Sequence, residues 1–220
     1  VAAGRAIGHT PAPVPDASPP TPSPPVPTPT PTPVSPTWQQ LNARDNDFIT
    51  VPGVGRVQHH EVSQREYARW LAEDARRPSP WSGARIAPQP ELPVTRVPWD
   101  DARAYCAALE AGATLPPVAL WTTLTREQSD WSTRVTFPQG QDARGVFHAA
   151  DRDVFRGVDD LIGNVAEWCD DAVEGSDHVA MGGRFNLLDA RDAARKMSRG
   201  EPVPAEALDD ALGFRCFAPR

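Results

Sequence analysis

Several kinds of residue are scarce in this sequence of 220 residues, and each shortage excludes a class of protein. No apolar run approaches the roughly 18 residues of a membrane-spanning helix, so the sequence predicts no such helix. The three cysteines are too few for a disulfide scaffold, although they allow one bridge and one free thiol. Only one of the 22 basic residues is a lysine, and the net charge is −7. Because no basic stripe is present, nucleic acid is not expected as a partner.

The start of the sequence lacks the pattern of a secretion signal, because residues 1–10 have neither a charged leader nor an apolar core. The first residue is Val1 rather than methionine. We therefore expect a fragment of a longer protein, in which a signal or a membrane anchor would lie upstream. Contact with a membrane is expected only through such an anchor.

Proline, in contrast, is abundant and unevenly placed. Thirteen of the 26 prolines lie in residues 1–37, which hold only two charged side chains, Arg5 and Asp16. Proline fixes φ and removes amide donors, so this stretch is typical of solvated polyproline II. At about 3.1 Å per residue, residues 11–36 could act as a spacer that holds the domain up to about 80 Å from its attachment point. The alternative is that they form a docking peptide for a proline-binding module. We expect a disordered linker over residues 1–37 and one globular domain over residues 38–220.

The hydrophobic pattern of the globular part predicts short helices and short strands. Residues 61–73 have apolar side chains at helical spacing, with Ser63 as the N-cap. A second helix begins at Trp99 and is stopped by Gly112. Few elements and much loop indicate an α+β domain. The other expected elements are a helical piece at residues 117–124 and strands within residues 47–57, 165–169, 179–185 and 213–217.

Short motifs follow one another along this domain. The most specific are Gly-Asn-Val-x-Glu-Trp at residues 163–168 and Gly-Phe-Arg at residues 213–215. The others are Glu-Val-Ser-Gln-x-x-Tyr-x-x-Trp at residues 61–70, Pro-Val-x-x-Val-x-Trp-x-Asp-Ala-x-x-Tyr-Cys at 93–106, Thr-Leu-Pro-Pro-x-Ala-x-Trp at 114–121, Phe-Pro-Gln-Gly at 137–140 and Gly-Gly at 182–183.

In this order the motifs resemble the formylglycine-generating enzyme family, also called the sulfatase-modifying factor domain. The resemblance covers residues 48–217, which is nearly the whole domain. It implies a C-type-lectin-like fold with few strands, two main helices and much irregular structure.

The resemblance implies a fold but not an activity, because the catalytic residues of the oxidase branch are missing. That branch uses a pair of cysteines shortly after the Gly-Gly motif to bind copper and activate oxygen on a substrate cysteine, and soft thiolates suit cuprous ion. Residues 182–192 contain no cysteine and no histidine, and the thiol positions fall approximately at Leu187 and Asp192. We therefore expect no copper and no formylglycine-generating activity.

A second branch of the family forms sulfur–carbon bonds with a non-haem iron held by three histidines, some of them from an added helical domain. No such domain is present in this sequence. His59 and His60 are adjacent, and in a strand they would point to opposite faces rather than to one ion. The remaining histidines are His9, His148 and His178. We expect no iron, and exposed or hydrogen-bonded histidines instead.

One metal site of the family is matched by the residues present here. The resemblance implies a structural calcium held by the side chains of Asp160 and Glu167 and by the backbone carbonyls of Gly163 and Val165. Hard oxygen ligands, two of them anionic, suit Ca²⁺. The alternative is a tight turn whose carboxylates cap backbone amides. A second calcium site of the family would lie in residues 137–158, where no convincing match is found.

The resemblance also implies a disulfide between Cys106 and Cys216, which are about 110 residues apart. Closing so long a loop contributes up to about 4–5 kcal/mol in the chain-entropy model. A bridge would indicate an oxidising compartment. The alternative is two buried thiols, since free cysteine is common in protein cores. Cys169 would then be a lone buried thiol.

Several arginines lie in the segment that corresponds, by the resemblance, to the catalytic strand and the following loop of the oxidase. By the resemblance, Arg184 and Arg191 face the groove in which the enzyme binds its peptide, so they are candidates for binding a ligand or partner. The alternative is a solvated charged loop balanced by neighbouring aspartates. Trp81 and Trp131 lie in loops flanked by polar residues, where aromatic side chains can form a recognition surface.

Together these observations favour a non-catalytic member of the family, a pseudoenzyme that acts as a sensor or protein-interaction domain. By analogy with similar domains, it would be the extracytoplasmic part of a bacterial membrane-anchored protein, such as a serine/threonine kinase or a secretion-system regulator. It would then lie in the periplasm or at the cell surface and bind an unidentified protein or small molecule.

Two alternatives stay open. One is a metal-dependent oxidoreductase of the formylglycine-generating or sulfoxide-synthase type with a non-standard site, for which stoichiometric iron or copper would be the sign. The other is a diversity-generating variable protein, whose lectin-like face tends to be rich in Asn, Ser, Tyr and Trp. Residues 184–212 have one Asn, one Ser and no aromatic residue except Phe185, which disfavours it.

Overall fold

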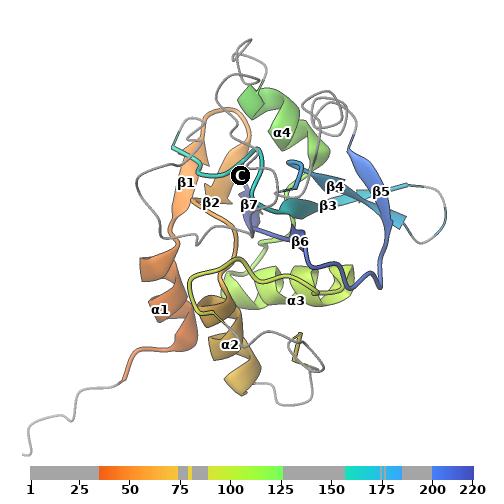
Figure 1. Ribbon diagram of the computed structural model, residues 1–220. Coiled ribbons are helices and arrows are strands. Elements are labelled where there is room, and N and C mark those ends of the chain that lie inside the picture. Colours follow the sequence, from red (N-terminus) through yellow and green to blue (C-terminus); the bar gives the residue numbers. More distant parts are fainter. Residues whose placement is uncertain are drawn as a thin grey trace, which may run out of the picture. The chain divides into compact units, whose positions relative to one another are not determined.

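Four helices and two small sheets make up the part of the chain that the structure, a computed structural model, describes (Figure 1). That part comprises residues 35–73, 79–80, 89–125, 157–173, 175, 177–184 and 200–220. From Pro36 onward it belongs to one compact unit, Pro36–Arg220. The helices are α1 (Trp38–Asp45), α2 (Gln64–Glu73), α3 (Trp99–Leu109) and α4 (Val118–Thr125). The strands are β1 (Phe48–Val51), β2 (Gly55–Gln58), β3 (Ala166–Ala172), β4 (Asp177–Met181), β5 (Glu201–Pro204), β6 (Leu212–Gly213) and β7 (Phe217–Pro219).

The end of the chain joins the two sheets. The first sheet has the antiparallel order β1-β2-β7, and the second has the order β5-β4-β3-β6, with β3 and β6 parallel. Gly213 in β6 pairs with Glu167 in β3, and a Cβ atom at Gly213 would lie only 2.7 Å from the Val94 carbonyl oxygen. Phe217 in β7 pairs with Val57 in β2. Residues 214–216 therefore cross from one sheet to the other.

The two helices expected from hydrophobic spacing are confirmed. Ser63 caps α2: its Oγ accepts from the Glu66 amide at 3.2 Å, while the Glu66 carboxylate accepts from the Ser63 amide at 2.8 Å. This reciprocal pair satisfies two donors that a helix start leaves open. In α3 the buried side chains recur every three or four residues, which places them on one face. These residues are Ala102, Tyr105, Cys106 and Leu109.

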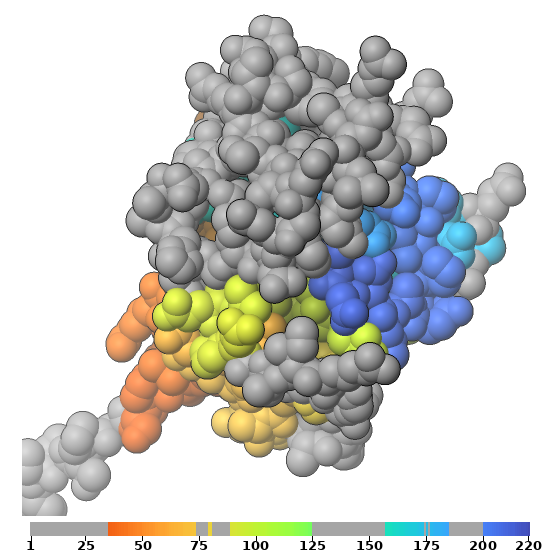
Figure 2. Space-filling view, in the orientation of Figure 1, coloured from red at the N-terminus to blue at the C-terminus, as the bar shows by residue number. Residues whose placement is uncertain are grey.

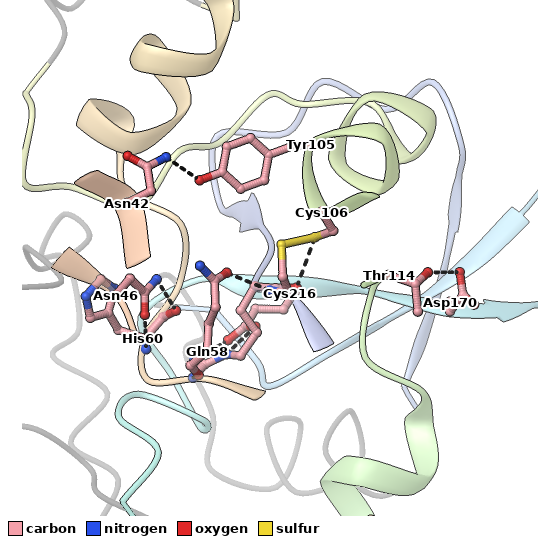
Figure 3. Close-up of a disulfide and its surroundings, with 11 residues drawn as sticks. Asn42, Asn46, Gln58, His60, Tyr105, Cys106, Thr114, Asp170 and Cys216 are labelled. Carbon is pink, nitrogen blue, oxygen red and sulfur yellow. Dashed lines mark hydrogen bonds and ion pairs between the residues drawn. A yellow bond between two sulfur atoms is a disulfide. The ribbon is translucent and has the colours of Figure 1, made fainter. Parts of the chain in front are cut away.

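Helix α1 was not expected, because the side chain that it buries fully is polar. Thr37 and Gln40 form a capping box at its start. Its buried side chain is Asn42, whose amide donates to the Glu66 carbonyl at 3.0 Å and to the Tyr105 hydroxyl at 2.9 Å (Figure 3). Strand β5 was not expected either, since two of its four residues are proline.

Two clusters of buried apolar side chains lie on the two sides of the strands. Figure 1 shows α2 and α3 on one side and α4 on the other. The first cluster includes Tyr67, Tyr105 and Phe214, whose ring centroids are 5.5–6.1 Å apart. The second includes Trp121 from α4 and Met181 from β4.

Backbone hydrogen bonds join the stretch before α3 to the C-terminal segment. The Arg96 amide donates to Asp209, and the Trp99 amide donates to Ala205. In Figure 2, the yellow-green stretch that begins near residue 89 accordingly lies between the orange helix α1 and the blue C-terminal segment. Within the described ranges, no helix has the length and apolar character needed to cross a bilayer.

Candidate functional site

Three acidic side chains and one arginine are buried where the two sheets meet. Glu61 follows β2, Asp160 lies in the loop before β3, Glu167 lies on β3, and Arg215 lies between β6 and β7. Each is at most 2% exposed. Charged groups are costly to bury, so this junction has to compensate its charges internally or through a bound ion.

Arg215 holds the junction together through both carboxylate and carbonyl contacts. Its Nε and Nη2 donate to the two oxygens of Glu167, each at 2.7 Å. Its Nη2 also donates to the Asp159 carbonyl at 2.9 Å, and its Nη1 donates to the His59 carbonyl at 3.1 Å. The bidentate geometry matches the planar guanidinium, which lysine could not reproduce. One side chain thus ties β3 to the exit of β2 and to the loop before β3.

Carboxyl groups outnumber the guanidinium among these four side chains. Burial raises the pKa of Glu61 well above its ordinary value, Asp160 and Glu167 raise it further, and Arg215 opposes them. Burial likewise raises the pKa of Glu167, although Arg215 counteracts this effect. Burial alone would lower the pKa of Arg215, but Glu167 and Glu61 reverse the direction. The guanidinium therefore opposes, but does not cancel, the upward shift in the pKa of the two glutamates.

The loop that carries the expected calcium ligands has an unusual backbone. Asp160 and Asn164 have φ values of 48° and 53°, and Gly163 has a φ of 95°. The Gly163 amide donates to the Gly182 carbonyl at 2.7 Å. A Cβ atom at Gly182 would lie 3.7 Å from the Val165 carbonyl oxygen, so this expected ligand lies close to the glycine that follows β4.

The donor set fits a hard divalent cation. A divalent cation would offset the negative charge of ionised carboxyl groups in this buried junction. Carboxylate and carbonyl oxygens are also the ligands that Ca²⁺ prefers. Within the described ranges, no three acidic, histidine or cysteine side chains are grouped as ligands around one point. A cation at this loop would therefore depend on backbone carbonyls, as the expected set of Asp160, Gly163, Val165 and Glu167 does. That ligand assignment stays a prediction.

The disulfide implied by the resemblance is present in the structure. Cys106 of α3 and Cys216 are joined with an S–S distance of 2.05 Å and a Cα–Cα distance of 5.3 Å (Figure 3). The Gln58 side chain supports the bridge, because its Oε1 accepts from the Cys216 amide at 2.8 Å. The third cysteine, Cys169, is free and buried, and burial raises the pKa of its thiol well above the ordinary value. No cysteine of this chain presents a reactive thiolate.

Of the four residues expected to bind a partner, the structure describes Arg184 alone. Its guanidinium pairs with Asp209 and lies 3.4 Å from Glu201. These ion pairs connect the end of β4 to β5 and to the segment before β6. Arg184 therefore has a structural role, and its role in partner binding stays a prediction. The other three residues, Arg191, Trp81 and Trp131, lie outside the described part of the chain, as do Leu187 and Asp192.

The described histidines have separate partners. His59 Nε2 lies 3.2 Å from an Asp159 oxygen, whereas the ring nitrogens of His60 face the carbonyls of Glu61 and Asp45. Burial lowers the pKa of His60 to about 4. His178 stacks on Trp99 with ring centroids 3.7 Å apart. His9 and His148 lie outside the described residues.

Sequence reasoning used Glu61 and Arg215 as motif residues but assigned neither of them to the site. The signal that could have identified them is a charged residue next to buried apolar residues in the sequence. Val62 follows Glu61, and Phe214 and Cys216 flank Arg215; all three are fully buried. Charged residues are almost never fully buried unless they are paired. A charge inside an apolar motif therefore predicts a buried partner, but not which one.

A family profile identifies the class of protein to which this fold and junction belong. The profile of the family described as "Sulfatase-modifying factor enzyme 1-like domain" matches residues 49–219. The chain therefore belongs to that family, as the motifs indicated.

A named mammalian protein shows the same relationship. The chain is 32% identical over 163 residues to the bovine (Bos taurus) "Inactive C-alpha-formylglycine-generating enzyme 2". That match covers 61% of this chain and 52% of the bovine protein, so the chain spans about half the length of the curated relative it matches.

Solved structures share the fold at low sequence identity. PvdO from Pseudomonas aeruginosa is 16% identical and superposes with a TM-score of 0.56, covering 75% of this chain and 80% of PvdO. CarF is 17% identical with a TM-score of 0.53, covering 75% of this chain and 86% of CarF. These likenesses show that the chain has the fold of this family, an α+β fold with much irregular structure.

Proposed function

We propose that this chain is a non-catalytic binding domain of the formylglycine-generating enzyme family. The observation that carries the proposal is the state of its three cysteines. Two form a disulfide and the third is buried with a raised thiol pKa, so no pair of thiolates is left to hold cuprous ion. The similarity to a protein named as an inactive member of the family supports the non-catalytic part of the proposal.

An extracytoplasmic location is part of the proposal. The buried disulfide supports it, because such bonds persist in oxidising compartments. The proline-rich residues 1–37, of which 1–34 lie outside the described part of the chain, support it by their composition. A polyproline II spacer of up to about 80 Å over residues 11–36 would suit a domain that reaches away from a membrane anchor. A membrane-anchored kinase or a secretion-system regulator is the kind of protein we propose around it.

A structural calcium ion is proposed at the loop before β3. Asp160 and Glu167 would hold it by their side chains, and Gly163 and Val165 by their carbonyls. The ion would supply positive charge to a junction where carboxyl groups outnumber the guanidinium. It would stabilise the fold and perform no chemistry on a substrate.

Binding by the chain can be tested by isothermal titration with soluble cell-wall fragments and with the purified extracytoplasmic domains of candidate partners. We expect saturable binding by at least one of these probes. The variant Arg191→Ala should weaken that binding, whereas Arg44→Ala should not, because Arg44 is an exposed residue of α1. Absence of saturable heat with every probe would contradict the binding function.

A further inference from the structure

The carbonyls of Gly163 and Val165 can serve one ion only if the turn between them is held in one shape. Asn164 lies between the two, and its φ of 53° is in the left-handed region. Residues other than glycine avoid this region, although asparagine tolerates it better than most. The conformation of Asn164 sets the relative direction of the peptide groups on either side of it. Something outside the turn has to select that conformation.

The side chain of Glu61 makes one such contact, directly to Asn164. Its Oε1 accepts from the Asn164 amide Nδ2 at 3.0 Å, although the two residues are 103 positions apart in the sequence. Both residues are buried, at 0% and 4% exposure. A hydrogen bond between buried groups is costly to break, because each would lose its partner without gaining water.

The backbone around Glu61 is itself fixed. The amide of the preceding residue, His60, donates to the Asn46 side chain at 3.2 Å. The amide of the following residue, Val62, donates to the Phe214 carbonyl at 2.9 Å. Glu61 is thus held on both sides and can act as a fixed point for the loop.

We propose that Glu61 and Asn164 are a positioning pair for the calcium site, in which the Glu61 carboxylate fixes the Asn164 side chain and so aims the Gly163 and Val165 carbonyls. The inference rests on the calcium site proposed above. Neither residue is in the expected ligand set of Asp160, Gly163, Val165 and Glu167. Partners of this kind, which orient metal ligands without touching the metal, typically change metal affinity by about 10- to 100-fold when they are removed.

The test is a titration of the full chain, freed of metal with EDTA, with calcium chloride, monitored by calorimetry and by the calcium-dependent shift in melting temperature. Glu61→Ala removes the acceptor and should weaken calcium binding about 10- to 100-fold. Glu61→Gln keeps an acceptor oxygen for Asn164 and should bind within about threefold of the natural chain. This rescue separates positioning from a contribution of the Glu61 charge.

The variant Asn164→Gly provides a second test of the pair, which does not depend on whether Glu61→Ala folds. Glycine allows the left-handed conformation but cannot be fixed by Glu61, so calcium affinity should again fall about 10-fold or more. The matched control is Glu66→Ala, which removes a buried carboxyl acceptor that is bonded to Ser63. It should lower the melting temperature without calcium and leave calcium affinity unchanged.

The outcomes separate the two proposals. Calcium binding by the natural chain together with unchanged affinity in Glu61→Ala and Asn164→Gly overturns the positioning pair and leaves the calcium site standing. Equal loss of affinity in Glu61→Gln and Glu61→Ala also overturns it, because the charge would then be what matters. No calcium binding by the natural chain overturns both the calcium site and the positioning pair. The partner-binding function is tested separately, by the titration with candidate partners.

Discussion

Burial of the Glu66 carboxyl group makes the stability of the domain depend on pH. Burial raises the pKa of Glu66 from 4.5 to about 7, although hydrogen bonds from Ser63 and Asn46 oppose the shift. The folded chain therefore holds this proton more tightly than the unfolded chain does. The stability it contributes is full below about pH 4.5 and is lost as the pH rises towards 7, a loss of about 3 kcal/mol.

Glu66→Gln should remove that loss, because glutamine has no proton to lose. In urea unfolding we expect the variant to gain stability over the natural chain between pH 4.5 and pH 7.5, by up to about 3 kcal/mol. His60, whose pKa is lowered to about 4, acts in the opposite direction between about pH 4 and 6.5. Both proteins contain His60, so its effect cancels in the difference. A difference that does not change with pH would refute the raised pKa.

Arg215 is the residue on which the charge balance of the sheet junction depends. Arg215→Leu would leave Glu167 and Glu61 buried without their cation, and breaking a buried pair in this way costs roughly 3–5 kcal/mol. Arg56→Leu is the matched control, since Arg56 pairs with Glu110 at the surface. It should cost at most about 1 kcal/mol. Similar unfolding free energies for the two variants would show that the buried network contributes little.

At the scale of elements, the disulfide ties α3 to the segment that enters β7. It closes a loop with a sequence separation of 110, which restricts the unfolded chain more than the folded one. The double variant Cys106→Ala/Cys216→Ala should therefore lose up to about 4–5 kcal/mol of unfolding free energy in urea. Cys169→Ala keeps the bridge and serves as the control for loss of a buried cysteine. Equal losses in the two proteins would mean that the bridge adds nothing beyond packing.

The elements that the sequence predicted are those defined by buried apolar side chains. Helices α2 and α3 follow the helical spacing of residues such as Tyr67 and Tyr105, and both were expected. Helix α1 was missed because the side chain it buries is Asn42, and the polar partners of Asn42 cannot be identified from periodicity. Strand β5 was missed because prolines in a four-residue run argue against a strand.

The candidate site was predicted less completely than the fold. Its expected ligands and the disulfide came from motif order, which places residues by resemblance to known proteins. The contacts of Arg215 with Glu167 and the contact of Glu61 with Asn164 join segments 48 and 103 residues apart. Such pairings depend on how the chain crosses between the two sheets, and no local pattern contains that information.

For the whole molecule, the central claim is that a family fold is retained here without the thiol chemistry of the oxidase. The structure contains the sheet junction, the helices and the disulfide. The oxidase chemistry needs two thiolates that this chain cannot supply, because two of its cysteines are bonded to each other and the third is buried. The fold of the family is therefore retained in a chain whose cysteines do not form a free thiol pair.

The most direct test of that claim is mass spectrometry of a cysteine-containing substrate peptide after incubation with the chain, cuprous ion and oxygen. An active member of the family, assayed in parallel, shows that the conditions support turnover. We expect that the peptide cysteine is not converted to formylglycine above the level seen without protein. Conversion over several turnovers, in proportion to the amount of this chain, would contradict it.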